Sequence, residues 1–137
     1  MTDTRLTLDQ ANDFLDANSG VQWIDVVLFD TNGIARGKRI RQSDLLAIAK
    51  NGIMMPMSVF IMDPLGNCVE ETGRLWETGD RDHHCHVLGK TLVPIPVGDG
   101  RHAQAVMAVD GKDDIDPRSV LSDQVEHFAR RRVDPMR

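Results

Sequence analysis

Apolar residues at helical spacing mark the beginning of the chain. Thr7 and Gln10 form a capping box, in which each side chain accepts a hydrogen bond from the backbone of the other residue. The helix that they predict has an apolar face made of Leu8, Ala11, Phe14 and Leu15. The polar sequence 18–20 ends in glycine and predicts the end of this helix.

Two strand-like runs follow, joined by a short polar turn. Trp23–Asp30 is mostly apolar and rich in β-branched residues, and a second run continues to Arg41. Asn32 and Gly33 can both adopt positive φ, which is the type I′ geometry that suits the twist of paired strands. The pattern therefore predicts a β-hairpin with a type I′ turn.

A second helix is predicted over residues 44–51. Ser43 is expected to cap it, Gly52 ends it, and its apolar face consists of Leu45, Leu46, Ile48 and Ala49. The following segment, 53–62, is apolar and rich in methionine. Pro56 lacks a backbone N–H group, so we expect short extended segments on either side of a bend rather than one regular strand.

Polar and apolar segments alternate in the second half of the chain. A turn at 63–67 leads into a polar surface loop over Glu70–Asp82, where functional residues usually lie. Strands are predicted after this loop, over 83–88, 91–97 and 103–109.

The last predicted element is an amphipathic helix after a linker at 110–114. Asp116 is its cap and Pro117 its first residue. Its apolar face consists of Val120, Leu121, Val125 and Phe128. The basic residues 130–132 suit the negative end of the helix dipole.

The order of the elements predicts an α+β fold. We expect a β-grasp-like mixed sheet with a helix packed on one face, plus flanking N- and C-terminal helices. Residues 1–20 form an N-terminal helical segment and 21–112 the β-grasp domain, while 113–137 hold the linker and the last helix. That helix either folds back onto the sheet or is the first helix of a second domain.

Composition and charge narrow the possible functions. With 137 residues, 41% of them hydrophobic and 27% charged, the chain has the composition of one soluble globular domain. Its net charge of −5 disfavours a general electrostatic grip on nucleic acid or on an anionic membrane. The sequence has neither a membrane-spanning run nor a signal-peptide core. Two cysteines, Cys68 and Cys85, fit a reducing compartment, so we expect a cytoplasmic protein.

The sequence His-His-Cys-His at 83–86 is the first candidate for chemistry. In a strand, His84 and His86 point to one side and could bind a metal, with Cys68 and His102 as further soft ligands. A closed zinc site needs four ligands, and the spacing of these residues does not supply them. The alternative is a set of polar strand residues at a sheet edge or a subunit contact.

Two charged groups are further candidates. The basic arm Arg36, Lys38, Arg39 and Arg41 could grip a phosphate or carboxylate, or pair with local carboxylates. The acidic loop residues Glu70, Glu71, Glu77, Asp80 and Asp82 could bind Mg²⁺ or an ammonium group, or form a solvated surface. Trp76 lies in the same loop and is an aromatic residue of the kind that marks contacts. The spacing gives no complete catalytic motif, so no catalytic residue and no metal ligand is assigned in this chain.

Residues 30–40, with the sequence DTNGIARGKRI, resemble the N-terminal domain of the glutamine synthetase superfamily. Within that superfamily the resemblance is to the γ-glutamylpolyamine (γ-glutamylputrescine) synthetase-like branch. It extends from about Gln22 onward, because further motifs match in the same order, at 51–52, 58–60, 63–66, 69–70, 72–73, 79–82, 91–92 and 116–121.

The resemblance implies that 21–112 is a glutamine synthetase-type β-grasp domain and that 113–137 is the linker and first helix of a truncated catalytic domain. In family members, ATP phosphorylates the γ-carboxylate of glutamate and an amine attacks the γ-glutamyl phosphate. The catalytic domain holds ATP and Mg²⁺ or Mn²⁺, so none of these is expected on this chain alone. The subunits form a homo-oligomeric ring in which the N-terminal domain completes a neighbour's active site.

The sequence departs from the ammonia-using members at the acceptor. Pro56 stands where those members have an aspartate that helps to bind ammonium, so we expect a bulkier primary amine such as a polyamine. Met54, Met55 and Met57 either suit its methylene chain or simply pack in the core. Glu70 or Glu71 is expected to receive its distal ammonium. The residues expected to complete a neighbouring subunit's substrate site are Pro56, Met57, Ser58, Glu70, Glu71 and Trp76.

Two other functions are compatible with the residues. One is a stand-alone β-grasp interaction module without catalytic activity, and the other is a small metal-binding protein that uses His84 and His86. A reading frame that continues beyond Arg137 into a Glu-x-Glu strand would favour the ligase over the module. Elemental analysis of dialysed protein would test the metal-binding protein.

Overall fold

The computed structural model describes residues 4–96, 98–111 and 115–131. The helices and strands are α1 (Leu8–Ala17), β1 (Trp23–Phe29), β2 (Ala35–Arg41), α2 (Leu45–Asn51), β3 (Ile53–Pro56), β4 (Asp82–Val87), β5 (Val93–Pro94), β6 (His102–Val109) and α3 (Pro117–Arg130). Single 3₁₀ turns are η1 (Gln42–Asp44), η2 (Met57–Phe60), η3 (Glu70–Thr72) and η4 (Gly89–Thr91).

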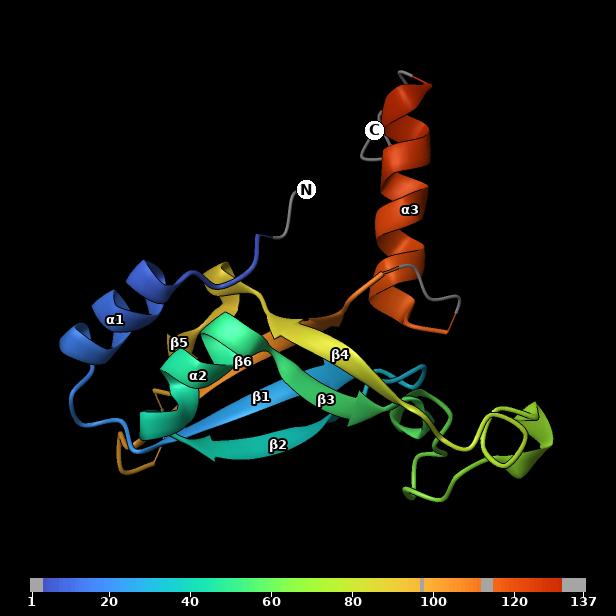
Figure 1. Cartoon of the computed structure of the whole chain (residues 1–137), viewed down its shortest axis with the longest axis horizontal. Helices are drawn as coiled ribbons and strands as arrows, with labels where there is room; N and C mark the ends of the chain where they lie inside the picture. The colour runs from blue at the N-terminus through green and yellow to red at the C-terminus, as the bar shows by residue number, and fades with distance from the viewer. Residues whose placement is uncertain (1–3, 97, 112–114, 132–137) are drawn as a thin grey trace.

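The strands form one mixed sheet in the order β2-β1-β6-β4-β3, and β5 pairs with the same edge of β6 as β4 does. The β1–β6 pair is parallel and the other pairs are antiparallel. Figure 1 shows α1 and α2 together on one side of the sheet, whereas α3 projects away from it. The predicted α+β, β-grasp-like fold is therefore confirmed.

The core lies between the sheet and the first two helices. Alternation along β1 buries Ile24, Val26 and Leu28, and the matching positions of β6 bury alanines and Met107. Ala11 and Leu45 are the fully buried residues of the two helices. Leu8 was expected on the buried face, but 43% of it is exposed, and the burial of α1 begins one turn later.

The hairpin is confirmed, but its turn is not type I′. The N–H of Gly33 donates to the carbonyl of Asp30, and the N–H of Asp30 donates to the carbonyl of Ile34. Gly33 has φ +75°, whereas Asp80 is the only non-glycine residue with positive φ in the described segments, so Asn32 does not. The Asp30 carboxylate explains the difference, because it accepts hydrogen bonds from the N–H groups of Asn32 and Ile34 and fixes a longer connection.

Gly37 is required by the close approach of the two hairpin strands. It pairs with Val27 in the register, and a Cβ at this position would lie 1.9 Å from the carbonyl oxygen of Val26. Any side chain there would force β2 away from β1. The glycine at position 37, within the matching stretch 30–40, is thus explained by packing between strands.

Local signals were correct at several helix ends and wrong at others. The capping box of α1, the end of α2 at Gly52 and the Asp116 cap of α3 are confirmed. The predicted cap by Ser43 is wrong, because the η1 turn precedes α2 and Asp44 becomes the cap residue without a side-chain bond.

Two predicted extended segments are shorter than expected. After Pro56 the chain forms the η2 turn rather than a second extended piece. In the predicted strand 91–97, only Val93–Pro94 pairs, and Val97 lies outside the described residues. Prolines without N–H donors limit pairing in both places.

Helix α3 keeps its apolar face open. Val120, Leu121 and Phe128 are 42%, 64% and 39% exposed, and no described residue of this helix is buried. The alternative in which this helix folds back onto the sheet is not observed (Figure 1). Linker residues 112–114 and Arg132 lie outside the described residues. No helix in the described part of the chain is long and apolar enough to cross a membrane.

Candidate functional site

The hairpin turn is attached to the end of η2 and to the segment that follows it. The hydroxyl of Thr31 donates to the carbonyl of Phe60 at 3.2 Å, and the Asn32 amide donates to the carbonyl of Met62 at 2.9 Å. The guanidinium of Arg36 donates to the carbonyl of Asp63 at 2.9 Å. The turn 63–67 begins there, as predicted, with the Gly66 N–H bonded to the Asp63 carbonyl.

Asp30 is the hub of this attachment. Its side chain has no exposed surface, and it accepts hydrogen bonds from the Asn32 and Ile34 N–H groups and from Arg36 Nε at 3.0 Å. Burial raises the pKa of the Asp30 carboxyl, but these hydrogen bonds and the Arg36 charge outweigh it and hold the pKa below the ordinary value. The Asp30–Arg36 ion pair therefore joins the β1–β2 hairpin to the chain that follows η2.

The basic arm makes structural contacts. Lys38 lies two positions after Arg36 and therefore on the same side of β2, and its Nζ donates to the carbonyl of Met54 at 2.8 Å. Arg39, on the other side, binds both carboxylate oxygens of Asp25 at 2.7 and 2.9 Å. The interpretation of the arm as partners for local carboxylates holds for Arg36 and Arg39.

Asp80 connects the polar loop to η2. Its Oδ1 accepts the backbone N–H of Ser58 at 3.0 Å, and its Oδ2 accepts the Ser58 hydroxyl at 2.9 Å. Ser58 is only 5% exposed, and its neighbour Met57 is 9% exposed. Residues 58 and 80 are therefore adjacent although 22 positions separate them.

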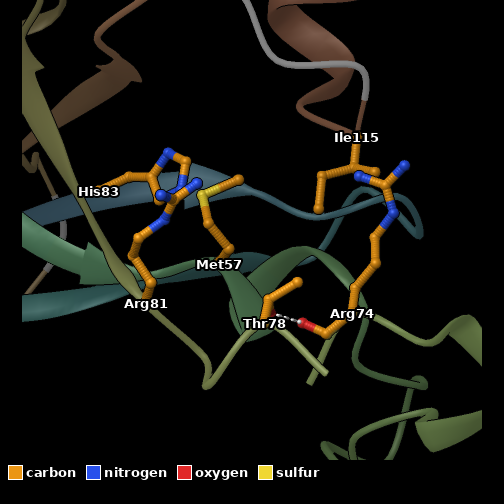
Figure 2. Close-up of a pocket in the computed structure, with 6 residues that line it drawn as sticks. All are labelled: Met57, Arg74, Thr78, Arg81, His83 and Ile115. Carbon is orange, nitrogen blue, oxygen red and sulfur yellow. Dashed lines mark hydrogen bonds between the residues drawn. The ribbon is translucent and has the colours of Figure 1, made fainter. Parts of the chain in front are cut away.

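Two neighbouring cavities lie beside this connection and share Arg74 and Ile115 in their linings. The smaller has a volume of about 120 Å³, and its other lining residues are Met57, Thr78, Arg81 and His83. Figure 2 shows Met57 beside His83 and Arg81, with Arg74 on the opposite side near Ile115. The larger has a volume of about 500 Å³ and a mainly apolar lining that includes Phe60, Ile61, Met62, Val69 and Thr72.

The six residues predicted from the sequence separate into two groups. Pro56, Met57 and Ser58 lie together at the end of β3 and in η2, and Met57 lines the smaller cavity. Glu70 and Glu71 are exposed in η3, between Val69 and Thr72, which line the larger cavity. Trp76 is 73% exposed and lines neither cavity. Their role in substrate binding stays a prediction.

Sequence reasoning did not select Arg74 and Arg81, which line the smaller cavity, and it considered His83 only as part of the histidine cluster. Arg74, Arg81 and His83 come from the loop and from β4, and only the fold brings them beside Met57. The matching motif at 79–82 was the available signal, because it holds both Arg81 and Asp80. The spacing of the motif did not indicate which partner Asp80 would bind.

The histidine cluster converges on a carboxylate. His84 and His86 point to one side of β4, as predicted, and the Nδ1 atom of each lies 2.5 Å from a carboxylate oxygen of Asp110. Arg5 donates to the same carboxylate at 2.7 Å, and His84 Nε2 lies 2.5 Å from the carbonyl of Asn51. No group of three or more potential ligands in the described residues is arranged to hold a metal ion.

The environment of this cluster shifts its proton equilibria. Hydrogen bonds to the Asn51 carbonyl and to Asp110 raise the pKa of His84. Burial raises the pKa of Asp110, but hydrogen bonds from His86 and His84 and the charge of Arg5 lower it by more. The pKa of Asp110 is therefore below the ordinary value. Burial, with the charges of Asp110 and Asp116, raises the pKa of the Cys85 thiol to about 11, which makes it an unreactive core residue.

The chain is similar to known proteins both in sequence and in fold. An alignment of 127 residues, which covers 90% of this chain, gives 35% identity to γ-glutamylputrescine synthetase PuuA of Escherichia coli strain K12. It spans 27% of the length of that relative. No family model matches the chain.

A solved structure of a GmaS/ADP complex has the same fold. It matches with a TM-score of 0.63 at 17% identity, and the match covers 91% of this chain and 26% of that one. The sequence identity supports the N-terminal domain of the glutamine synthetase family that the sequence predicted, and the structural match shows that the fold is shared.

Proposed function

We propose that the chain is the N-terminal part of an ATP-dependent ligase that joins the γ-carboxyl group of glutamate to a primary amine, with a polyamine preferred. The 35% identity to γ-glutamylputrescine synthetase over 90% of the chain carries this proposal. The complete reaction consumes ATP, glutamate and the amine and releases ADP, phosphate and the γ-glutamyl amide. ATP and Mg²⁺ or Mn²⁺ bind outside residues 1–137, so the chain alone is inactive.

The acceptor amine lies in the larger cavity, in a site that this domain completes for a neighbouring subunit of a homo-oligomer. Phe60, Ile61 and Met62 supply an apolar lining of the size that a short methylene chain needs. The guanidinium of Arg81, which lines only the smaller of the two cavities, disfavours an ammonium group there. Glu70 and Glu71 lie in the chain between Val69 and Thr72, which line the larger cavity, and they attract the distal ammonium of a diamine.

The reaction itself tests the ligase. The protein encoded by the complete reading frame is assayed with ATP, Mg²⁺ and glutamate, and with either putrescine or ammonia as acceptor. We expect γ-glutamylputrescine with a higher kcat/KM than glutamine, and no product from residues 1–137 alone. Preference for ammonia would overturn the polyamine acceptor. A natural stop after Arg137 would instead favour the stand-alone interaction module.

The position of the distal ammonium is tested by charge removal. Replacing Glu70 and Glu71 with glutamine should raise the KM for putrescine about five- to tenfold, because one charge-assisted contact is lost. The KM for glutamate should not change. Glu77→Gln is the matched control, since Glu77 is an acidic residue of the same loop whose sequence neighbours Trp76 and Thr78 do not line the larger cavity. An equal effect of Glu77→Gln would show that only the net charge of the loop matters.

A further inference from the structure

Asp80 has a backbone conformation that is costly for its residue type. Its φ is +44°, which makes it the only non-glycine residue in the left-handed region within the described segments. It follows Gly79, whose φ is +70°, so two consecutive residues turn the chain sharply. Asp tolerates this region better than most residues, but the conformation persists only where its surroundings hold it.

Two kinds of contact hold this corner. The Asp80 N–H donates to the carbonyl of Leu75 at 2.9 Å, which closes the corner from inside the loop. The carboxylate then reaches the buried Ser58 with both oxygens, at 3.0 and 2.9 Å. The corner thus aims a charged acceptor at a part of the molecule that is distant in sequence.

Ser58 needs such an acceptor. Its N–H is one of the first donors of η2, which have no partner inside a helical turn. Pro56 is the cap residue of this turn and makes no side-chain hydrogen bond to it. Asp80 therefore acts as the cap of η2 from another segment of the chain.

The same contact sets the two walls of the smaller cavity. Met57, next to Ser58, forms one side of the cavity (Figure 2). Thr78 and Arg81, which precede and follow Asp80 in the sequence, also line it. The loop also carries Thr72 and Arg74, which line the larger cavity. The spacing between η2 and the loop therefore depends on the bond between Asp80 and Ser58.

We propose that Asp80 is a positioning residue for the acceptor amine: by capping Ser58 it holds the loop 70–82 against η2 and fixes the shape of the acceptor site. This inference rests on the proposed ligase function. Asp80 does not touch the reacting atoms. It acts through Ser58 and through the loop, so its removal changes how the amine is held rather than the chemical step.

Kinetics of the complete ligase test this role. Asp80→Ala loses both hydrogen bonds and should raise the KM for putrescine about tenfold, with kcat and the KM for glutamate changed less than twofold. Asp80→Asn keeps an acceptor for the Ser58 N–H, and its amide can donate to the hydroxyl, so it should restore most of the affinity. Asp82→Asn is the matched control, because Asp82 is an exposed aspartate two positions away, and it should leave all three constants unchanged.

A second measurement separates this inference from the ligase function. Amide hydrogen exchange of residues 57–60 should be faster in Asp80→Ala than in the wild type, and unchanged in Asp82→Asn. If the wild type has no ligase activity, the proposed function fails and the exchange result alone decides whether Asp80 positions the loop. Unchanged exchange, or equal losses of kcat and of affinity for both substrates, would overturn the inference.

Discussion

Two carboxylates, Asp30 and Asp110, each hold several distant segments together, but their partners differ in chemistry. The Asp30 side chain is fully buried and bonded to two backbone N–H groups and to Arg36. The Asp110 side chain is 25% exposed and bonded to His84, His86 and Arg5. Peptide N–H groups and arginine keep their protons at every physiological pH, whereas imidazole does not.

The geometry of His84 makes this difference specific. Its Nδ1 faces a carboxylate and its Nε2 faces the carbonyl of Asn51, so both nitrogens face acceptors and both must carry protons. His84 is therefore an imidazolium in this arrangement, in agreement with its raised pKa. The hub at Asp30 is permanent, and the hub at Asp110 depends on proton concentration.

The locations of the two hubs match this difference. Asp30 secures the hairpin to residues 60–63 beside the candidate acceptor site, where a fixed geometry is needed. Asp110 lies directly after β6, at the beginning of the linker to α3. In this molecule, the carboxylate beside the candidate acceptor site binds donors that do not titrate, and the carboxylate where the chain leaves the sheet binds histidines that do.

The largest expected effect is the removal of Asp30. Asp30→Ala leaves Arg36 partly buried without its partner and two N–H groups without acceptors, so it should lower the free energy of unfolding by about 3–5 kcal/mol. Urea unfolding monitored by tryptophan fluorescence measures this change. Asp25→Ala is the matched control, because it also removes the partner of an arginine of β2, but at a more exposed site. A loss below about 1 kcal/mol for Asp30→Ala would mean that the hub adds little to stability.

Removal of Asp110 should have a smaller effect. Its carboxylate is partly exposed, and water can replace some of its hydrogen bonds, so Asp110→Ala should cost about 1–2 kcal/mol at pH 6. The same unfolding experiment measures it. A cost equal to that of Asp30→Ala would remove the distinction between the two hubs.

Local sequence signals were sufficient for most elements of the fold. The Thr7–Gln10 capping box, the Asp116-Pro117 helix start and the β-branched run of β1 depend on residues close in sequence, and the elements that they predict are confirmed. Ser43 was chosen as a cap by residue type alone. That choice failed because the η1 turn placed Asp44 at the cap position, and residue types alone do not reveal such a turn.

The candidate site was only partly predictable, because its contacts are long-range. Ser58 was selected from the aligned motif at 58–60 and Met57 as one of the methionines around Pro56, but the Ser58–Asp80 bond joins segments 22 positions apart. Likewise, alternation placed His84 and His86 on one side of β4, while Asp110 was assigned only to a linker. Sequence periodicity gives the direction of a side chain, and the partner that it meets depends on the topology of the sheet.

The pH dependence of stability is the third test of the comparison. The pKa of His84 is raised in the folded state, so its contribution is complete below the ordinary value of 6.5 and is lost as pH rises through the folded pKa. The pKa of Asp110 is lowered, so its contribution is present above 3.8 and is lost as pH falls through the folded pKa. The hub at Asp110 should therefore be strongest between these two limits.

A matched pair of variants isolates this effect. The difference in unfolding free energy between wild type and His84→Gln should be larger at pH 6 than at pH 9. The corresponding difference for Arg36→Gln should be the same at both values, because the pKa of Asp30 is lowered and arginine stays charged. If the difference in unfolding free energy between wild type and His84→Gln were the same at pH 6 and pH 9, the imidazolium assigned from the contacts of both ring nitrogens would be wrong.

The smallest expected effect concerns Arg5, whose side chain is 60% exposed where it binds Asp110. An exposed ion pair gains little, so Arg5→Gln should lower the free energy of unfolding by about 0.2–1 kcal/mol, and by less at 1 M salt. Its charge also opposes protonation of the nearby His84. Arg5→Gln should therefore move the loss of stability above pH 6.5 to higher pH, which an unfolding series across that range would detect. A shift to lower pH would mean that Arg5 supports the His84–Asp110 contact by holding the carboxylate in place, rather than competing with the imidazolium for it.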